Sequence, residues 1–324
     1  MAYKPAARGY RGEMLVGMET EFGKLPAGAA GWKIPFNTES LTISRAKNTA
    51  ATLRGTRNPA EPFDGNTAVD GDLVVPVDTS TFGLWLSLLF GTPSSEAQEG
   101  ETGLYTHTFA SGEELPSFWT EVMIATQTPI YKRSLGCKIS TLALQAGGDG
   151  ELTATLGLMA ASQTQESAAA VAAPEEMPFN RLANFQVLLK VDGQVTGNAM
   201  SFSVNLDNGL DGEVRLLSGQ GFRADLPEGL MGVSGTMDVM VTDGDLYAKA
   251  LASTPLDLEL LFTKGQESLT IKLPKVQLQV TGPVIDGPAG LKMSWNWQAY
   301  SVQPEDAAMT VELVNTLPDY TPGN

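Results

Sequence analysis

Two copies of one alternating pattern constrain the fold of this chain more than any other feature of its sequence. The stretches SLTIS (40–44) and SFSVN (201–205) each place small polar and apolar residues in turn, and they lie 161 positions apart in a chain of 324 residues. Alternation with a period of two is typical of a β-strand that buries one face. The repeat therefore predicts two domains, each containing a similar strand.

The residues after each copy continue the parallel in the same order. VDGDLVVPV (69–77) returns as VSGTMDVMV (233–241), and each is followed by an Asp-capped helical stretch that ends near Thr-Pro. A further strand and a closing hairpin follow in both halves. Because several elements recur in one order, we interpret the sequence as an internal duplication.

The stretch between the two halves differs from both. It is rich in Ala, Ser and Gln and lacks strand alternation, so we predict a linker. The expected fold class is mainly β, with two tandem β-sandwich or barrel domains, each with a short flanking helix and a long loop or hairpin. The expected division is an N-terminal arm and first domain over 1–160, a linker over 161–178, a second domain over 179–302 and a C-terminal tail over 303–324.

Charge and cysteine usage narrow the range of functions. The chain has 37 acidic and 21 basic residues, a net charge of −16, and no run of Lys and Arg with which to hold phosphates. Its single cysteine, Cys137, cannot form an internal disulfide or a Cys-rich zinc site. The apolar stretch at 82–90 is too short to span a bilayer, and the N-terminus lacks the apolar core of a signal peptide. We therefore expect a protein made in a cytoplasm, without a membrane partner.

The alternation assigns strand residues to two faces. One face is apolar and is expected to form the core, including Leu41, Ile43, Val280, Trp295 and Trp297. The opposite face is either the ordinary solvent side of an antiparallel sheet or the lining of a wet cavity, and its shortage of Lys and Glu favours a lining. The candidate lining residues are Ser40, Thr42, Thr153, Thr155, Ser201, Ser203, Asn205, Gln277, Gln279, Ser294 and Asn296.

Candidates for catalysis are few. His107 is the only histidine, and no Gly-x-Ser-x-Gly turn marks a nucleophile. Cys137 lies among apolar strand positions and is expected in the core. DNGLDGE (207–213) lacks the regular spacing of a calcium loop and is predicted to be a turn, with weak metal binding left open. We predict no catalytic residue, no cofactor, no metal site and no enzyme.

Soft motifs also run through much of the chain. LVGMETEFG is followed by a Trp and a Pro-Phe pair, an Arg-Gly-x-Arg stretch lies in the long polar segment, and a hairpin closes the first half near 136–160. In these motifs the chain resembles the tail tube proteins of long-tailed, non-contractile bacteriophages. The matching positions are Gly17, Glu19, Phe22, Gly23, Trp32, Pro35, Phe36, Arg54, Gly55 and Arg57.

This resemblance implies a structural role in the virion. Tube domains of the family join in rings, their inner sheets form one barrel around a lumen, and rings stack through a long loop and an N-terminal arm. A chain with two such domains implies a trimeric ring with pseudo-sixfold symmetry, through which DNA passes without specific binding. The implied partners are further copies of the chain, a tape measure protein, a tail terminator and a distal tail protein, with assembly in the host cytoplasm. The candidates for contacts between rings are Arg45, Lys47, Arg54, Arg57, Asp207, Asp211 and Arg215.

Two other functions are left open by the sequence. A soluble β-sandwich binding module, or an adhesin of a phage tail fibre, would use an exposed aromatic face for which Trp295 and Trp297 are candidates. An acidic glycoside hydrolase would bring two carboxylates together in a cleft. Candidate carboxylate pairs are Glu19/Glu21, Glu113/Glu114, Glu175/Glu176 and Asp243/Asp245.

Overall fold

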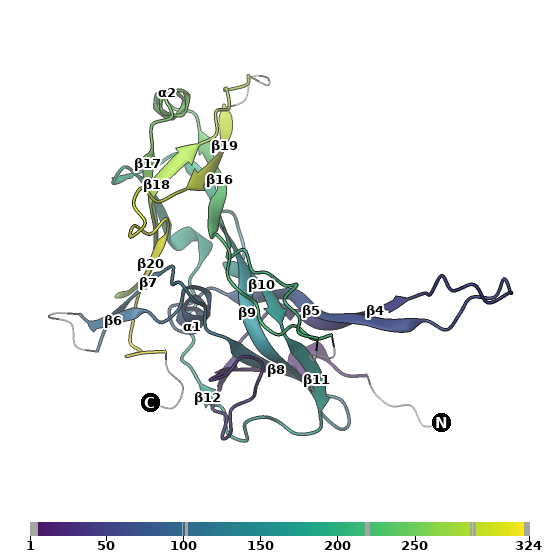
Figure 1. Cartoon of the computed structure of the whole chain (residues 1–324). Coiled ribbons are helices and arrows are strands. Elements are labelled where there is room, and N and C mark those ends of the chain that lie inside the picture. Colours follow the sequence, from purple (N-terminus) through teal and green to yellow (C-terminus); the bar gives the residue numbers. More distant parts are fainter. Residues whose placement is uncertain are drawn as a thin grey trace.

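A computed structural model describes residues 6–98, 100, 103–217, 221–285, 287 and 290–320. The fold is mainly β, as predicted, and its strands form two packed layers (Figure 1). Helix α1 (Thr81–Phe90) lies in the core with every residue buried, whereas α2 (Asp245–Leu251) buries only Ala250. Short 3-10 turns occupy η1 (Gly9–Arg11) and η2 (Asn184–Gln186).

One layer is a continuous antiparallel sheet that runs through both halves of the chain, and we call it the long sheet. Its order in space is β4 (Thr42–Asn48), β5 (Phe63–Pro76), β10 (Thr153–Ala160), β9 (Ile130–Ala146), β15 (Ala199–Asp207), β16 (Gly232–Met240), β19 (Lys292–Ala299) and β18 (Glu267–Leu278). The short strand β3 (Thr38–Glu39) also pairs with β5. The halves meet at β9 and β15, where Leu142 lies opposite Leu206.

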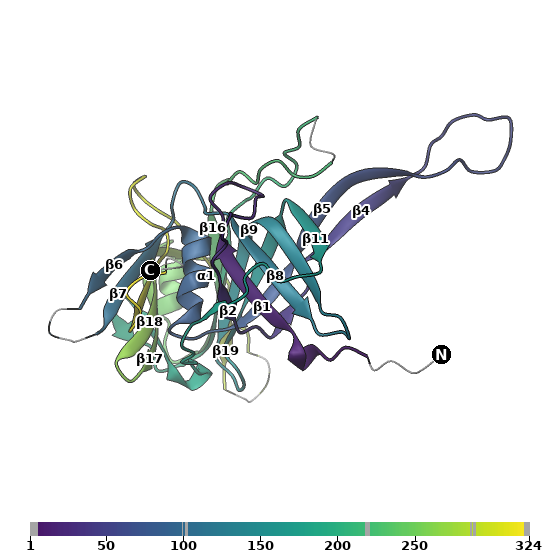
Figure 2. The same ribbon diagram turned by 90° about the horizontal axis from the view of Figure 1, so that it is seen from below.

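The other layer is one smaller sheet for each half, and the long strands β9 and β18 take part in both layers. The first comprises β2 (Trp32–Ile34), β1 (Glu13–Met18), β8 (Phe118–Ile124), β9 and β11 (Ser162–Glu166), with β12 (Glu175–Glu176) parallel to β2. The second comprises β14 (Gln194–Val195), β13 (Val187–Val191), β17 (Leu256–Lys264), β18, β20 (Thr310–Asn315), β7 (Tyr105–Ala110) and β6 (Ser94–Ala97). Strands β6 and β7 come from the first half, so the second sheet ties the two halves together (Figure 2).

The two halves pair their strands in the same order. β4, β5, β10 and β9 correspond to β15, β16, β19 and β18, and the outer hairpins β8–β9 and β17–β18 shift register at the same place. One hydrogen bond fixes the correspondence: the Asp72 N–H donates to Ser40 Oγ (2.8 Å), and the Thr236 N–H donates to Ser203 Oγ (2.9 Å). Ser40 therefore corresponds to Ser203, and not to Ser201 as the sequence repeat indicated. A strand pattern of period two looks the same after a shift of two residues, which is why the sequence alone aligned the two strands two residues out of register.

Most of the expected core is buried. Leu41, Trp295 and Trp297 are between 1% and 3% exposed, but Ile43 is 42% exposed and Val280 is 54% exposed, contrary to prediction. Both exceptions lie at the two outer edges of the long sheet, where no strand of the described residues covers them. The helix signal was correct: the Asp78 carboxylate accepts from the N–H groups of Ser80 and Thr81, both at 2.7 Å, and so caps α1.

Two segments expected to be loops contain strands. Strand β11 lies within the expected linker, and β20 lies within the expected C-terminal tail. β11 is a half-exposed edge strand of polar residues, so it lacks the apolar alternation that marks a strand in the sequence. The domain boundaries stay a prediction.

Candidate functional site: the polar face and edges of the long sheet

The long sheet presents one polar face, opposite its core. The eleven candidate lining residues are exposed or half-buried on it, while the residues between them along β10, β15 and β19 are buried. Cross-strand pairs join their positions across the sheet, such as Thr155 with Ala143, Ala143 with Asn205, and Asn205 with Ser234. The face is therefore continuous across the junction between the halves.

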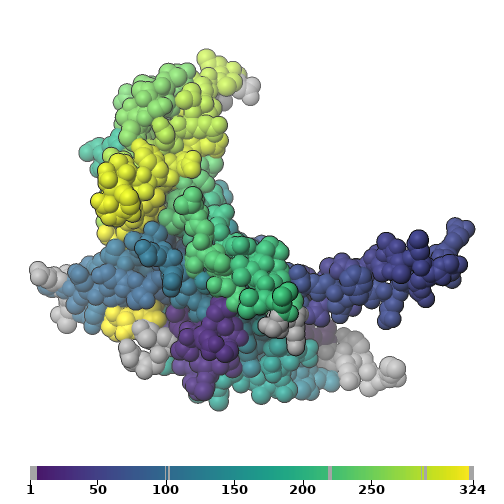
Figure 3. All heavy atoms as spheres, viewed as in Figure 1, coloured from purple at the N-terminus to yellow at the C-terminus, as the bar shows by residue number. Residues whose placement is uncertain are grey.

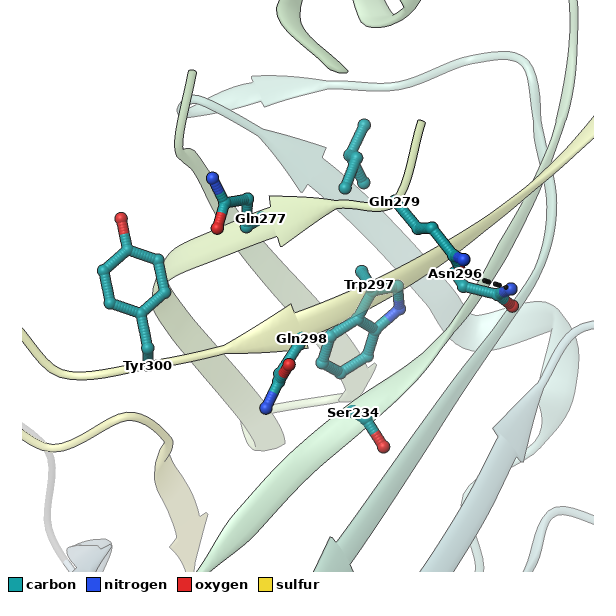
Figure 4. A pocket seen from close by; sticks show the side chains of 8 residues that line it. Ser234, Gln277, Gln279, Asn296, Trp297, Gln298 and Tyr300 are labelled. Carbon is teal, nitrogen blue, oxygen red and sulfur yellow. Dashed lines mark hydrogen bonds between the residues drawn. The ribbon is translucent and has the colours of Figure 1, made fainter. Parts of the chain in front are cut away.

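Some side chains on this face bond to one another. Ser203 Oγ lies 2.8 Å from Thr236 Oγ1, and the Ser201 hydroxyl donates to the Asp238 carboxylate. Near the β18 edge, Asn296 Nδ2 donates to Gln279 Oε1 (3.0 Å) beside a shallow hollow (Figure 4). These pairs satisfy part of the hydrogen-bonding capacity of the face.

Carboxylates on the same face were missed by the sequence interpretation. Asp70, Asp72, Asp207 and Asp238 alternate in phase with the polar positions of their strands. The sequence contained a signal for them. In VDGDL, Asp70 and Asp72 lie on either side of Gly71 and occupy the positions that alternate with the core positions of the strand. The polar face is thus acidic as well as hydrogen-bonding.

Four of the candidates for contacts between rings lie on a hairpin that leaves the body of the molecule, and we call residues 42–70 the arm. Arg45 Nε donates to Thr67 Oγ1 (3.0 Å), and Lys47 pairs with Asp64 across the two strands. Arg54 and Arg57 lie beyond the strand ends and are exposed. Figure 3 shows the arm standing clear of the rest of the chain.

The other three candidates lie at the corresponding connection of the second half, residues 207–231, which we call the brace. Asp207 and Asp211 accept from backbone N–H groups two residues ahead, so DNGLDGE forms turns as predicted. Arg215 pairs with Glu213 (2.7 Å) and donates to the Thr67 carbonyl (3.4 Å) at the base of the arm. The sequence placed the arm and the brace in one class, but the brace packs back against the first half.

A single buried arginine holds the brace. The Arg223 side chain is 4% exposed and donates to both carboxylate oxygens of Asp70 (2.7 and 3.1 Å) and to the carbonyls of Val69 and Ala160. A bidentate guanidinium–carboxylate pair fixes both distance and angle. Lys138 adds a second anchor by donating to Glu228 (2.6 Å). Nothing in the sequence marked Arg223, because its partners in the first half lie 63 to 154 residues away, although its Nε also donates to the nearby Gly212 carbonyl (2.8 Å).

A family model described as phage tail tube protein matches residues 9–299, nearly the whole chain. The chain belongs to the phage tail tube protein family. No match was found among curated proteins. Tail tube proteins are structural components of the virion tail that assemble into a tube, so the family confirms the resemblance noted in the sequence.

The remaining candidates have structural positions in this tail tube protein. His107 is fully buried: its Nε2 lies 3.1 Å from Asn315 Oδ1 and 3.0 Å from the Leu317 carbonyl, and burial lowers its pKa. Cys137 is also fully buried, which raises the pKa of its thiol. Buried Trp295 and Trp297 leave the alternative binding module without its aromatic face.

Two further observations concern the described residues only. Within the ranges that the structure describes, no three His, Cys, Asp or Glu side chains come together as a metal site. In the same ranges no helix has the length and apolar character needed to cross a membrane.

Proposed function

We propose that this tail tube protein closes into trimeric rings that stack into the tail tube, with the polar face of the long sheet lining the lumen. The observation that carries the proposal is the β9–β15 junction, where the inner strands of two similar halves already form one sheet. The same joint, repeated between chains, would pair the outer edges β4 and β18. Unpaired strand edges favour association, and ring closure removes them.

The number of copies follows from the two halves. If each half is one tube domain, three chains supply a pseudo-sixfold ring of roughly 24 strands, which encloses a lumen rather than a packed core. We infer that the halves arose by duplication, on the evidence of their shared strand order and shared hydrogen bond at Ser40 and Ser203.

A polar, acidic lining suits the passage of DNA. Asp72, Asp207 and Asp238 would repel phosphates, whereas Asp70 is paired with Arg223, and several neighbouring polar side chains bond to one another. The tube would therefore let DNA through during ejection without binding it. The eleven candidate lining residues keep that role in the proposal.

The arm is the proposed contact between stacked rings, with Arg45, Lys47, Arg54 and Arg57 on it. Asp207, Asp211 and Arg215 of the brace would contribute at the base of the arm. At the ends and inside of the tube, the expected partners are a tail terminator, a distal tail protein and a tape measure protein. The setting is a siphovirus tail assembled in the host cytoplasm.

Electron microscopy of the purified full chain tests the proposal directly. We expect rings and stacked tubes whose class averages have threefold symmetry with a weaker sixfold repeat. A protein that stays monomeric at high concentration contradicts the ring, and strict sixfold symmetry contradicts the trimer.

A further inference from the structure

Ile43 and Val280, the two expected core residues that are exposed, lie where a neighbouring chain could pair with the long sheet. The shared hydrogen bond aligns Ser40 with Ser203, so Ile43 corresponds to Leu206. Trp297 lies opposite Leu278 as Leu158 lies opposite Ile139, and the Gln279 N–H continues the ladder to the Asn296 carbonyl (2.8 Å). β9 has a one-residue bulge between Ile139 and Thr141 that β18 lacks, so Val280 corresponds to Leu142.

At the internal junction these counterparts face each other. Leu142 and Leu206 are cross-strand partners and are 2% and 1% exposed, respectively. Ile43 and Val280 occupy the same positions at the two open edges, where they are 42% and 54% exposed. Ile43 and Val280 are therefore exposed because each is one half of such a cross-strand pair, and the two halves lie at opposite edges of the long sheet.

The open β4 edge is occupied by a side chain instead of a strand. The Ile43 N–H donates to Gln163 Oε1 (3.0 Å), and Gln163 Nε2 donates to the Leu41 carbonyl (3.0 Å). Both backbone groups point away from β5, because alternate residues of an antiparallel strand bond to opposite neighbours. The amide of Gln163 thus holds the N–H and the C=O that a further strand would use, and Lys132 Nζ also donates to the same Leu41 carbonyl (2.9 Å).

The second half provides an internal control for this contact. Gln163 lies in the β11 register opposite Ser134, which corresponds to Leu273. The β18–β20 register ends with Lys272 opposite Thr310, and its continuation by one residue places Met309 beside Leu273. Met309 is fully buried and has no amide. The capping side chain is therefore found at the open edge and is replaced by an apolar one where β9 already covers the equivalent edge.

We propose that Gln163 guards the β4 edge of the free subunit, and that ring closure exchanges its amide for residues 279–282 of a second copy, with Ile43 opposite Val280. The proposal rests on the ring function above and identifies the residues that pair between neighbouring chains, which we call the seam. In this register Thr42 lies opposite Thr281 and Leu41 lies opposite Gly282. Pro283 fits, because the missing N–H at its position would point toward β19 and not toward the seam.

The exchange explains how an aggregation-prone edge is kept from pairing at random. Any strand that pairs with this edge replaces two hydrogen bonds to Gln163 by ladder hydrogen bonds. A strand other than the correct one therefore gains little net free energy from pairing. The correct partner also buries Ile43 and Val280 against each other, which adds apolar burial that the guard does not supply.

Substitution of the guard by its own counterpart tests this inference. Gln163→Met should lower the threshold concentration for tube formation about tenfold, as expected from the loss of two hydrogen bonds that favour the free subunit. Light scattering gives the threshold and electron microscopy confirms that the products are tubes. Gln165→Met, an exposed neighbour on the same strand, is the matched control. A threshold for Gln163→Met equal to or above that of the control overturns the guard.

A cysteine pair tests the register without touching the guard. In assembled tubes, Thr42→Cys with Thr281→Cys should form disulfide-linked oligomers, since facing non-hydrogen-bonded residues lie about 4.5 Å apart at Cα. Thr42→Cys with Gln279→Cys, two residues out of register, should not. The buried Cys137 does not interfere. Tubes in which only the second pair cross-links overturn the seam but leave the ring intact, whereas the absence of rings from every preparation overturns the proposed function itself.

Discussion

The arm and the brace connect corresponding strands of the two halves and behave in opposite ways. The arm joins β4 to β5 and extends away from the body. Gln163, Arg215 and Arg223 contact its base, and beyond the base it is held by pairs within itself such as Lys47 with Asp64. The brace joins β15 to β16 and is fastened to the first half by Arg223. The difference shows that a few anchors, the buried Arg223 guanidinium and the Lys138–Glu228 ion pair among them, turn a projecting connection into an internal support, while the strands around it stay alike.

Loss of Arg223 should have the largest effect on this contrast. Arg223→Ala removes a bidentate ion pair and leaves the carbonyls of Val69 and Ala160 without their donor, so we expect the free energy of unfolding to fall by about 3 kcal/mol. Urea denaturation measures the change, and proteolysis should cut the freed brace. Arg223→Lys keeps the positive charge but not the planar, bidentate guanidinium, so it should recover only part of the lost free energy of unfolding. A variant as stable as the wild type would mean that the brace is held elsewhere.

Two corresponding glycines, Gly71 on β5 and Gly235 on β16, test how closely the packing of the two halves agrees. A Cβ on Gly235 would lie 1.9 Å from the Ser203 carbonyl oxygen, and one on Gly71 would lie 2.4 Å from that of Ser40. Both Ala variants should be destabilised by about 2 kcal/mol through overpacking, with Gly235→Ala the worse. Thermal unfolding compares them, with Gly232→Ala as the control because no atom lies within 4 Å of its Cβ. A neutral effect at either site would contradict the assigned correspondence.

His107 makes the link between the halves sensitive to pH. Burial lowers its pKa below the ordinary value of 6.5, so the unfolded chain binds more protons than the folded chain as the pH drops below about 6.5. The free energy of unfolding should therefore fall as the pH falls through that value. His107→Gln should flatten this part of the profile, measured as unfolding midpoints between pH 8 and 5. An equal slope in both proteins would assign the dependence to other groups.

Shortening the arm should have the smallest effect on stability. Replacement of residues 50–61 by a two-residue Asn-Gly turn removes exposed chain and no core, so the unfolding midpoint should shift by less than about 2 °C. If the arm joins rings, electron microscopy should show separate rings in place of tubes. Tubes of normal length from this variant would exclude the arm as the stacking element.

Local patterns in the sequence predicted the strands and the core, because alternation and caps act over a few residues. SFSVN, buried Leu41 and the Asp cap of α1 were interpreted correctly, as were buried Trp295 and Trp297, whereas Ile43 of SLTIS was not. The register between copies was not, since a period of two cannot distinguish Ser201 from Ser203. The contacts of Arg223 with the first half and of Gln163 with β4 were also beyond reach, because they join residues more than 60 positions apart.

The two exposed core residues show a different limit. Ile43 and Val280 have the sequence pattern of buried positions, and the isolated chain leaves them in solvent. If the proposed ring forms, the pattern of burial reflects the environment in the assembly, whereas the structure of one chain has only its own contacts. The disagreement at these two residues would then come from the difference between the two states.

The pairing of β7 with β20 sets the order in which the chain can finish folding. Ala110 lies opposite Thr310, so about 200 residues must be synthesised after β7 before its partner exists. At ribosomal speeds of about 5–20 residues per second, that interval lasts roughly 10–40 s. During this time the first half has its strands while the sheet that joins it to the second is incomplete. Translation itself therefore delays the competent subunit, and a nascent chain has no finished ring surface to offer its neighbours.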